Sequence, residues 1–79
     1  MKIVEFFDLI GDEYEAARLK YPPFHSTHEG IAVLQEEVDE LWEMVKKNKG
    51  TMIKQEMVRE CIQIAAMSFA FIKDLGRDE

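Results

Sequence analysis

The segment 59-RECIQIAAMSFAF-71 is the most apolar part of the chain, and it decides which fold the sequence can adopt. From Cys61 onward, every residue of the segment is apolar or small except Gln63 and Ser68. Glu60 and Gln63 stand at its head, three residues apart, so on a helix they point the same way. Burying a carboxylate and an amide costs several kcal/mol each unless they are paired, roughly speaking. We therefore expect both side chains to face a partner.

Upstream, a first helix is expected from about Ile3 to Leu19, where apolar residues form a loose stripe. Gly11 weakens its middle. The helix must end before Pro22 and Pro23, because proline lacks the backbone N–H that a helix requires.

A second helix is expected to begin at Ser26, a capping residue with Glu29 at the capping-box spacing. It should run to about Lys47, where Asn48 or Gly50 is free to adopt left-handed geometry. Its apolar seam, spaced alternately by three and four residues, comprises Ile31, Leu34, Val38, Leu41 and Val45.

The third helix contains the opening segment and is expected to run from a cap at Thr51 to about Leu75, stopping at Gly76. From Cys61 to Ile72 it is apolar nearly all round, and such a helix must be enclosed on every side. Two other helices cannot enclose it. The sequence therefore predicts an all-α, single-domain chain (residues 1–79) that forms a helical bundle by homo-oligomerisation. The bundle would be a dimer or tetramer with the third helix at its centre.

Composition narrows the classes of function. The 79 residues include 16 acidic and 10 basic ones, a formal net charge of −6, which argues against a nucleic-acid binder. A nucleotide substrate stays possible, because a divalent metal held by carboxylates can carry the positive charge. No signal peptide is recognisable, and the longest apolar run is too short to span a membrane. A soluble, cytoplasmic protein without a membrane partner is expected.

The second helix carries five carboxylates in 35-QEEVDELWE-43. Glu36, Asp39 and Glu43 lie away from the seam and are expected in solvent. Glu37 and Glu40 instead belong to a row that begins and ends with apolar residues, so they are expected to face protein or ligand.

The third helix has a matching row, Glu56, Glu60, Gln63 and Met67. If the two helices pair antiparallel, the two rows lie opposite each other. Three crowded carboxylates repel unless a cation sits among them or their pKa values rise. Oxygen-only ligands favour Mg²⁺ or Mn²⁺. The alternative is neutralisation by Arg59 or by lysines of another subunit, without a metal.

Two motifs, Glu37-x-x-Glu40 in EEVDEL and Glu60-x-x-Gln63 in ECIQIA, are separated by 19 residues. They resemble the E-x-x-E and E-x-x-D motifs of the MazG-like branch of the all-α nucleoside triphosphate pyrophosphohydrolases. The resemblance covers about residues 29–74. It implies a bundle of two or more subunits that hydrolyses a nucleoside triphosphate between the α and β phosphates, giving a monophosphate and pyrophosphate.

By this resemblance Glu37, Glu40 and Glu60 would be the catalytic residues that hold Mg²⁺. Gln63 replaces the aspartate of the family pattern; its amide oxygen can coordinate but brings no charge. Glu56, one turn earlier, could supply the missing charge. The alternative is a non-catalytic helical module that oligomerises or binds a nucleotide.

Other residues allow two readings each. Cys61 is expected to pack as a small apolar residue rather than act as a reactive thiol. His25 and His28 fit a capping loop better than a metal site. The aromatic residues Tyr21, Phe24 and Trp42 are expected in the core, with stacking on a nucleobase as the alternative.

Overall fold

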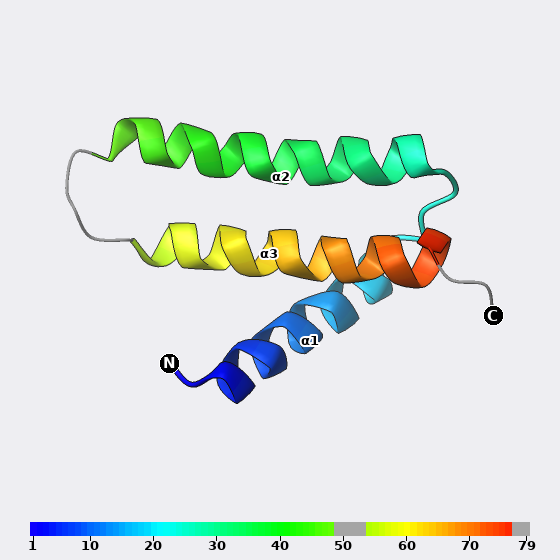
Figure 1. Ribbon diagram of the computed structural model, residues 1–79, viewed down its shortest axis with the longest axis horizontal. Coiled ribbons are helices and arrows are strands. Elements are labelled where there is room, and N and C mark those ends of the chain that lie inside the picture. Colours follow the sequence, from blue (N-terminus) through cyan, green and yellow to red (C-terminus); the bar gives the residue numbers. More distant parts are fainter. Residues whose placement is uncertain (49–53, 77–79) are drawn as a thin grey trace.

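The computed structural model describes residues 1–48 and 54–76, and within these ranges all regular structure is helical. The α-helices are α1 (Ile3–Lys20), α2 (Thr27–Lys47) and α3 (Gln55–Phe71), and a short π-helix, η1 (Ile72–Gly76), continues α3. α2 and α3 lie side by side and run in opposite directions, while α1 crosses α3 at an angle (Figure 1). The all-α prediction is confirmed, and the two helices that carry the acidic motifs form an antiparallel pair.

α1 ends one residue beyond its expected end. Tyr21, after the last helical residue, is extended, and Pro22 and Pro23 follow it, so the helix cannot continue. The C-terminal half of α1 packs against α3, where the ring of Tyr14 meets the ring of Phe69 edge to face with centroids 4.8 Å apart. The angle between α1 and α3 carries the N-terminal half of α1 away from the helical pair (Figure 1).

α2 begins as predicted, with Ser26 as its cap. The Ser26 hydroxyl oxygen accepts a hydrogen bond from the Glu29 N–H at 3.1 Å. The Glu29 carboxylate accepts from the His25 N–H at 2.6 Å instead of closing the capping box on Ser26. At the other end, Asn48 has φ −84°, so its predicted left-handed geometry is wrong, and Gly50 lies outside the described residues.

The third helix differs from its prediction at both ends. Its expected cap, Thr51, lies outside the described residues, and α3 begins at Gln55 after an extended Lys54. The helical stretch reaches Gly76, but from Ile72 onward it is a π-helix. Single π-helical turns are rare and often occur at functional sites. Here the turn carries Asp74, which contacts both α1 and the segment before α2.

The face of α2 that packs on α3 is rotated relative to the predicted seam. Leu34 and Leu41 are half-buried as expected, but Ile31, Val38 and Val45 are exposed, so this part of the prediction is wrong for the single chain. The fully buried residue of α2 is Gly30, against the ring of Phe71 in α3 and the side chain of Leu75 in η1. Because glycine has no side chain, the contact centres on the Gly30 side of α2, which carries Val33, Glu37 and Met44.

The buried apolar core of the described residues is small and lies almost wholly on α3. Met57, Ala66 and Ala70 are its buried apolar side chains, and Glu60 is buried among them. α3 is central, as predicted, but it is flanked by α1 and α2 of its own chain. The predicted assembly of several chains is not decided by this arrangement. None of the described helices combines the length and apolar character that crossing a bilayer would require.

Candidate metal centre and the adjoining cavity

Two helices bring three glutamates together at the middle of the helical pair. Glu37 and Glu40 lie one turn apart on α2, and Glu60 reaches them from α3. Each offers a carboxylate oxygen, and these three oxygens all lie within 4.8 Å of one another. The i, i+3 spacing puts the α2 acids on one side of that helix, and the antiparallel pairing brings Glu60 opposite them. The predicted meeting of these acids is therefore present in the fold.

Glu60 lies in the interior, with only 5 % of its surface exposed. A hydrogen-bonding contact with the Glu37 side chain, its own burial and the charge of Glu37 together raise the pKa of Glu60 to about 7. One oxygen of each residue, Glu37 Oε2 and Glu60 Oε1, is buried without a hydrogen-bond partner. A buried polar atom without a partner is costly, so this pair of oxygens fits a site that a cation completes.

Glu40 closes the cluster on its solvent side. Its side chain is exposed, and the pKa of Glu40 is raised above the usual glutamate value, chiefly by the charge of Glu60. The ion pairs recorded among the described residues are Arg18–Asp74, His25–Glu29 and Lys46–Glu43, so none of them neutralises the cluster. Arg59, the neutralising partner considered from the sequence, is exposed and makes no ion pair in the described part of the chain.

Oxygen ligands without sulfur or imidazole suit a hard divalent cation. Such cations take carboxylate oxygens and leave further positions to water or to phosphate oxygens. Neither His25 nor His28 belongs to the cluster found among the described residues. The three carboxylates can therefore hold Mg²⁺ or Mn²⁺ between α2 and α3.

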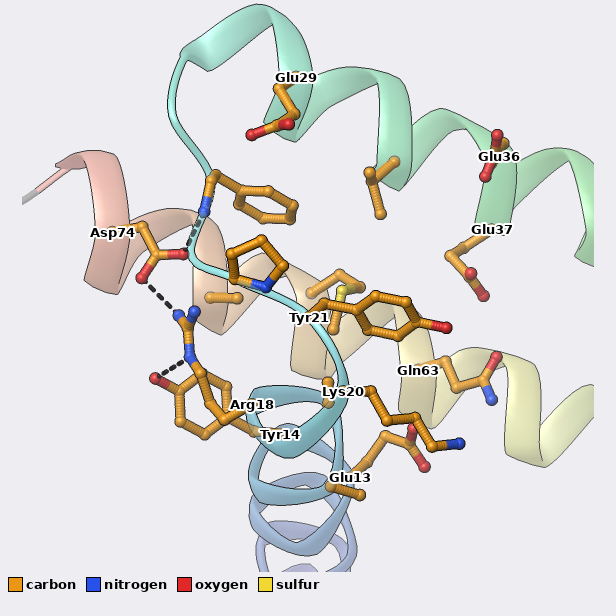
Figure 2. Close-up of a pocket in the computed structure, with 17 residues that line it drawn as sticks. Glu13, Tyr14, Arg18, Lys20, Tyr21, Glu29, Glu36, Glu37, Gln63 and Asp74 are labelled. Atoms are coloured by element: carbon orange, nitrogen blue, oxygen red, sulfur yellow. Dashed lines mark hydrogen bonds and ion pairs between the residues drawn. The ribbon is translucent and has the colours of Figure 1, made fainter.

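The two remaining site candidates take different positions. Gln63 is half-buried and lines a cavity together with Glu37, so its amide lies beside the carboxylates (Figure 2). Glu56 is exposed and does not belong to the group of three.

A cavity of about 500 Å³ adjoins the three carboxylates through Glu37 and Gln63. Its walls come from the end of α1, the segment that follows it, α2 and the end of α3. Tyr21 and Lys20 lie on the same side of the cavity as Glu37 and Gln63 (Figure 2). Its volume falls within the range typical of small-molecule sites, about 300–1,000 Å³.

A polar clasp closes the far end of this cavity. The Arg18 guanidinium donates to the Asp74 carboxylate and to the Tyr14 hydroxyl, the latter at 2.8 Å. The other Asp74 oxygen accepts from the Phe24 N–H at 2.9 Å (Figure 2). Asp74 thus fixes the segment between α1 and α2 to the π-helix. Sequence reasoning missed this clasp, because Arg18 and Asp74 are 56 residues apart and belong to no local motif.

The remaining single residues lie as follows. Cys61 is exposed in the single chain, so its predicted packing is wrong at this level of structure. Tyr21 and Trp42 are also exposed rather than in the core, whereas Phe24 is half-buried in the cavity wall. Lys46 lies over the ring of Trp42, 5.7 Å from its centroid.

Comparison with known proteins returns nothing similar: no protein-family model matches the chain, and no curated protein or solved structure does.

Proposed function

We propose that this protein is a Mg²⁺- or Mn²⁺-dependent nucleoside triphosphate pyrophosphohydrolase that works as a homo-oligomer. The observation that carries the proposal is the meeting of Glu37, Glu40 and Glu60 within 4.8 Å, with buried oxygens of Glu37 and Glu60 unpaired. The motif resemblance supports the same reaction: hydrolysis between the α and β phosphates, with release of a monophosphate and pyrophosphate.

The three carboxylates would hold the metal, and Gln63 would add a neutral oxygen contact. A bound divalent ion would neutralise phosphate charge and lower the pKa of the attacking water. Because Glu37 and Gln63 also line the cavity, a nucleotide with its phosphates at the carboxylates would place its nucleoside in the cavity. There Tyr21 would stack on the base, and Lys20 would compensate charge.

The test is a panel of nucleoside triphosphates incubated with the protein and Mg²⁺ or Mn²⁺, with pyrophosphate and monophosphate quantified. Glu40→Gln should abolish release, because it removes a negative ligand and keeps the side chain's size. Glu43→Gln is the matched control, since Glu43 lies on the same helix but pairs with Lys46 on the exposed surface. Absence of release by the wild-type protein, or equal release by both variants, would refute the enzymatic function.

A second candidate is a non-catalytic, oligomeric nucleotide-binding module. It is favoured by Gln63, which brings no negative charge where the resembled motif has an aspartate. This candidate predicts that a nucleotide alone raises the melting temperature and Mg²⁺ alone does not, because a ligand stabilises only the state it binds. The enzymatic proposal predicts stabilisation by Mg²⁺ without nucleotide.

A further inference from the structure

One flank of α2 exposes an apolar stripe that nothing in the chain covers. Ile31, Val38, Trp42 and Val45 recur along this helix at steps of seven, four and three, so they share one flank. Each of them is exposed, although the other residues of the predicted seam pack against α3. The stripe runs along nearly the whole length of α2.

α3 presents a matching flank of mostly small residues. Cys61, Ala65, Ser68 and Ile72 are spaced four, three and four apart, so they too lie along one side of the helical stretch. Cys61 and Ile72 are exposed, and Ala65 and Ser68 are partly so. The Ser68 hydroxyl donates to the Ile64 carbonyl at 2.9 Å, which leaves it without an unmet donor.

Both flanks lie on the same side of the antiparallel pair. On α2 the stripe is the flank opposite Glu29 and Glu36, which line the cavity. On α3 it is the flank opposite Gln63 and Ala70, which also line the cavity. The helical pair thus has the cavity on one side and, on the other, an uncharged apolar face. We define this apolar face by eight residues: Ile31, Val38, Trp42, Val45, Cys61, Ala65, Ser68 and Ile72.

The surface area of the chain indicates that a face of this kind is covered. The chain exposes 6268 Å². A compact monomer of its 9.2 kDa mass would expose only about 4,900 Å². The excess of roughly 1,300 Å² is larger than the ~800 Å² that each partner buries in a standard protein interface. The chain therefore carries enough surplus surface for a stable dimer.

We propose that a second copy of this chain packs against the apolar face, two helices against two, and leaves both cavities open on the outside. The face is self-complementary: large side chains lie on the α2 flank and small ones on the α3 flank. A two-fold axis sets the α2 flank of each copy against the α3 flank of its partner, with large residues opposite small ones. The inference defines the surface of the assembly in the proposed function and does not depend on catalysis.

The test is the mass of the protein in solution without metal or nucleotide, so its result is separate from that of the enzymatic assay. Light scattering after size exclusion should give at least twice the 9.2 kDa chain mass for the wild type. Val38→Glu, which places a charge in the apolar face, should give a helical monomer. Leu19→Glu is the matched control, because Leu19 is 90 % exposed outside the face, and it should leave the mass unchanged.

A rival surface exists on the N-terminal half of α1, where Phe7 is exposed. An assembly that dissociates in Phe7→Glu but persists in Val38→Glu would overturn the proposal, as would a monomeric wild type at 100-micromolar order of concentration. If both variants dissociate or Val38→Glu does not fold, maleimide labelling of Cys61 in the wild type decides. Protection that is lost on dilution supports the apolar face as the interface, and immediate labelling at every concentration refutes it.

Discussion

At the scale of single residues, Glu60 sets the electrostatics of the candidate site. Its folded-state pKa of about 7 lies above the ordinary glutamate value of 4.5. Between these values the folded state holds a proton that the unfolded state has released, so stability without metal falls as pH rises from about 4.5 to about 7. We expect the free energy of unfolding to be lower at pH 8 than at pH 5.5 by on the order of 1–3 kcal/mol from this group.

Urea unfolding at several pH values without divalent metal measures this dependence. Glu60→Gln should flatten the curve, because glutamine cannot ionise. An unchanged slope in this variant would show that another group causes the dependence.

The same three carboxylates predict a metal-dependent stability. Mg²⁺ at about 100 times its dissociation constant should raise the free energy of unfolding by about 2.7 kcal/mol. Glu40→Gln and Glu60→Gln should lose this stabilisation at the same metal concentration. Glu56→Gln should retain it, because Glu56 lies outside the cluster of three. Thermal melts with Mg²⁺ and with EDTA measure the difference; loss in Glu56→Gln alone would contradict the assignment of ligands.

At this scale, the spacing in the sequence was enough to pair Glu37, Glu40 and Glu60, because i, i+3 positions on two antiparallel helices have few ways to meet. The unpaired oxygens and the raised pKa of Glu60 could not be predicted, since they depend on how deeply α3 is buried.

At the scale of helices, the contact between α2 and the end of α3 depends on Gly30. A Cβ atom at this position would lie 2.5 Å from Phe71 Cδ2 and 3.3 Å from Leu75 Cδ1. Overpacking of this kind costs roughly 1–3 kcal/mol, against a gain of up to about 1 kcal/mol from replacing a helical glycine. Gly30→Ala should therefore lower the melting temperature.

Gly11→Ala is the matched control, because a Cβ at Gly11 meets nothing within 4 Å. It should raise the melting temperature through helix propensity alone. Equal effects of the two variants would show that close packing at Gly30 does not matter.

The clasp between the π-helix and α1 gives a second prediction at this scale. Asp74→Ala removes the acceptor for both Arg18 and the Phe24 N–H, and hydrogen bonds to charged groups are worth about 1.5–3 kcal/mol. We expect destabilisation of at least about 1.5 kcal/mol. Glu43→Ala, which removes an exposed ion pair with Lys46, should cost less than about 1 kcal/mol. Chemical denaturation compares them, and similar losses would mean that the clasp carries no special stability.

The helix boundaries were largely predictable, because proline and Ser26 act within one turn of their own positions. The rotation of α2 was not, because the predicted seam counted apolar residues and could not show that Gly30 allows the closest approach. Nor was the π-helical turn, whose Asp74 is held by residues from the other end of the chain.

At the scale of the whole molecule, the surplus surface predicts that stability depends on protein concentration. The Cα radius of gyration is 13.6 Å, against about 11.6 Å for a compact chain of this length. If assembly covers the apolar face, the melting temperature should rise over a hundredfold increase in concentration, because folding and association are then coupled. Calorimetry or circular dichroism measures this rise. A constant melting temperature, together with a monomeric mass, would mean that the single chain accounts for its own stability.

By itself, the sequence determined that the chain is helical, where its helices start and stop, and which acidic residues share a helix face. These properties follow from contacts within a few residues and from the 3.6-residue period of the helix. Only the tertiary structure decided that Glu60 is buried beside Glu37, that Asp74 joins both ends of the fold, and that the apolar stripe of α2 faces away from α3. Each of these depends on the rotation and approach of packed helices, which local periodicity leaves open.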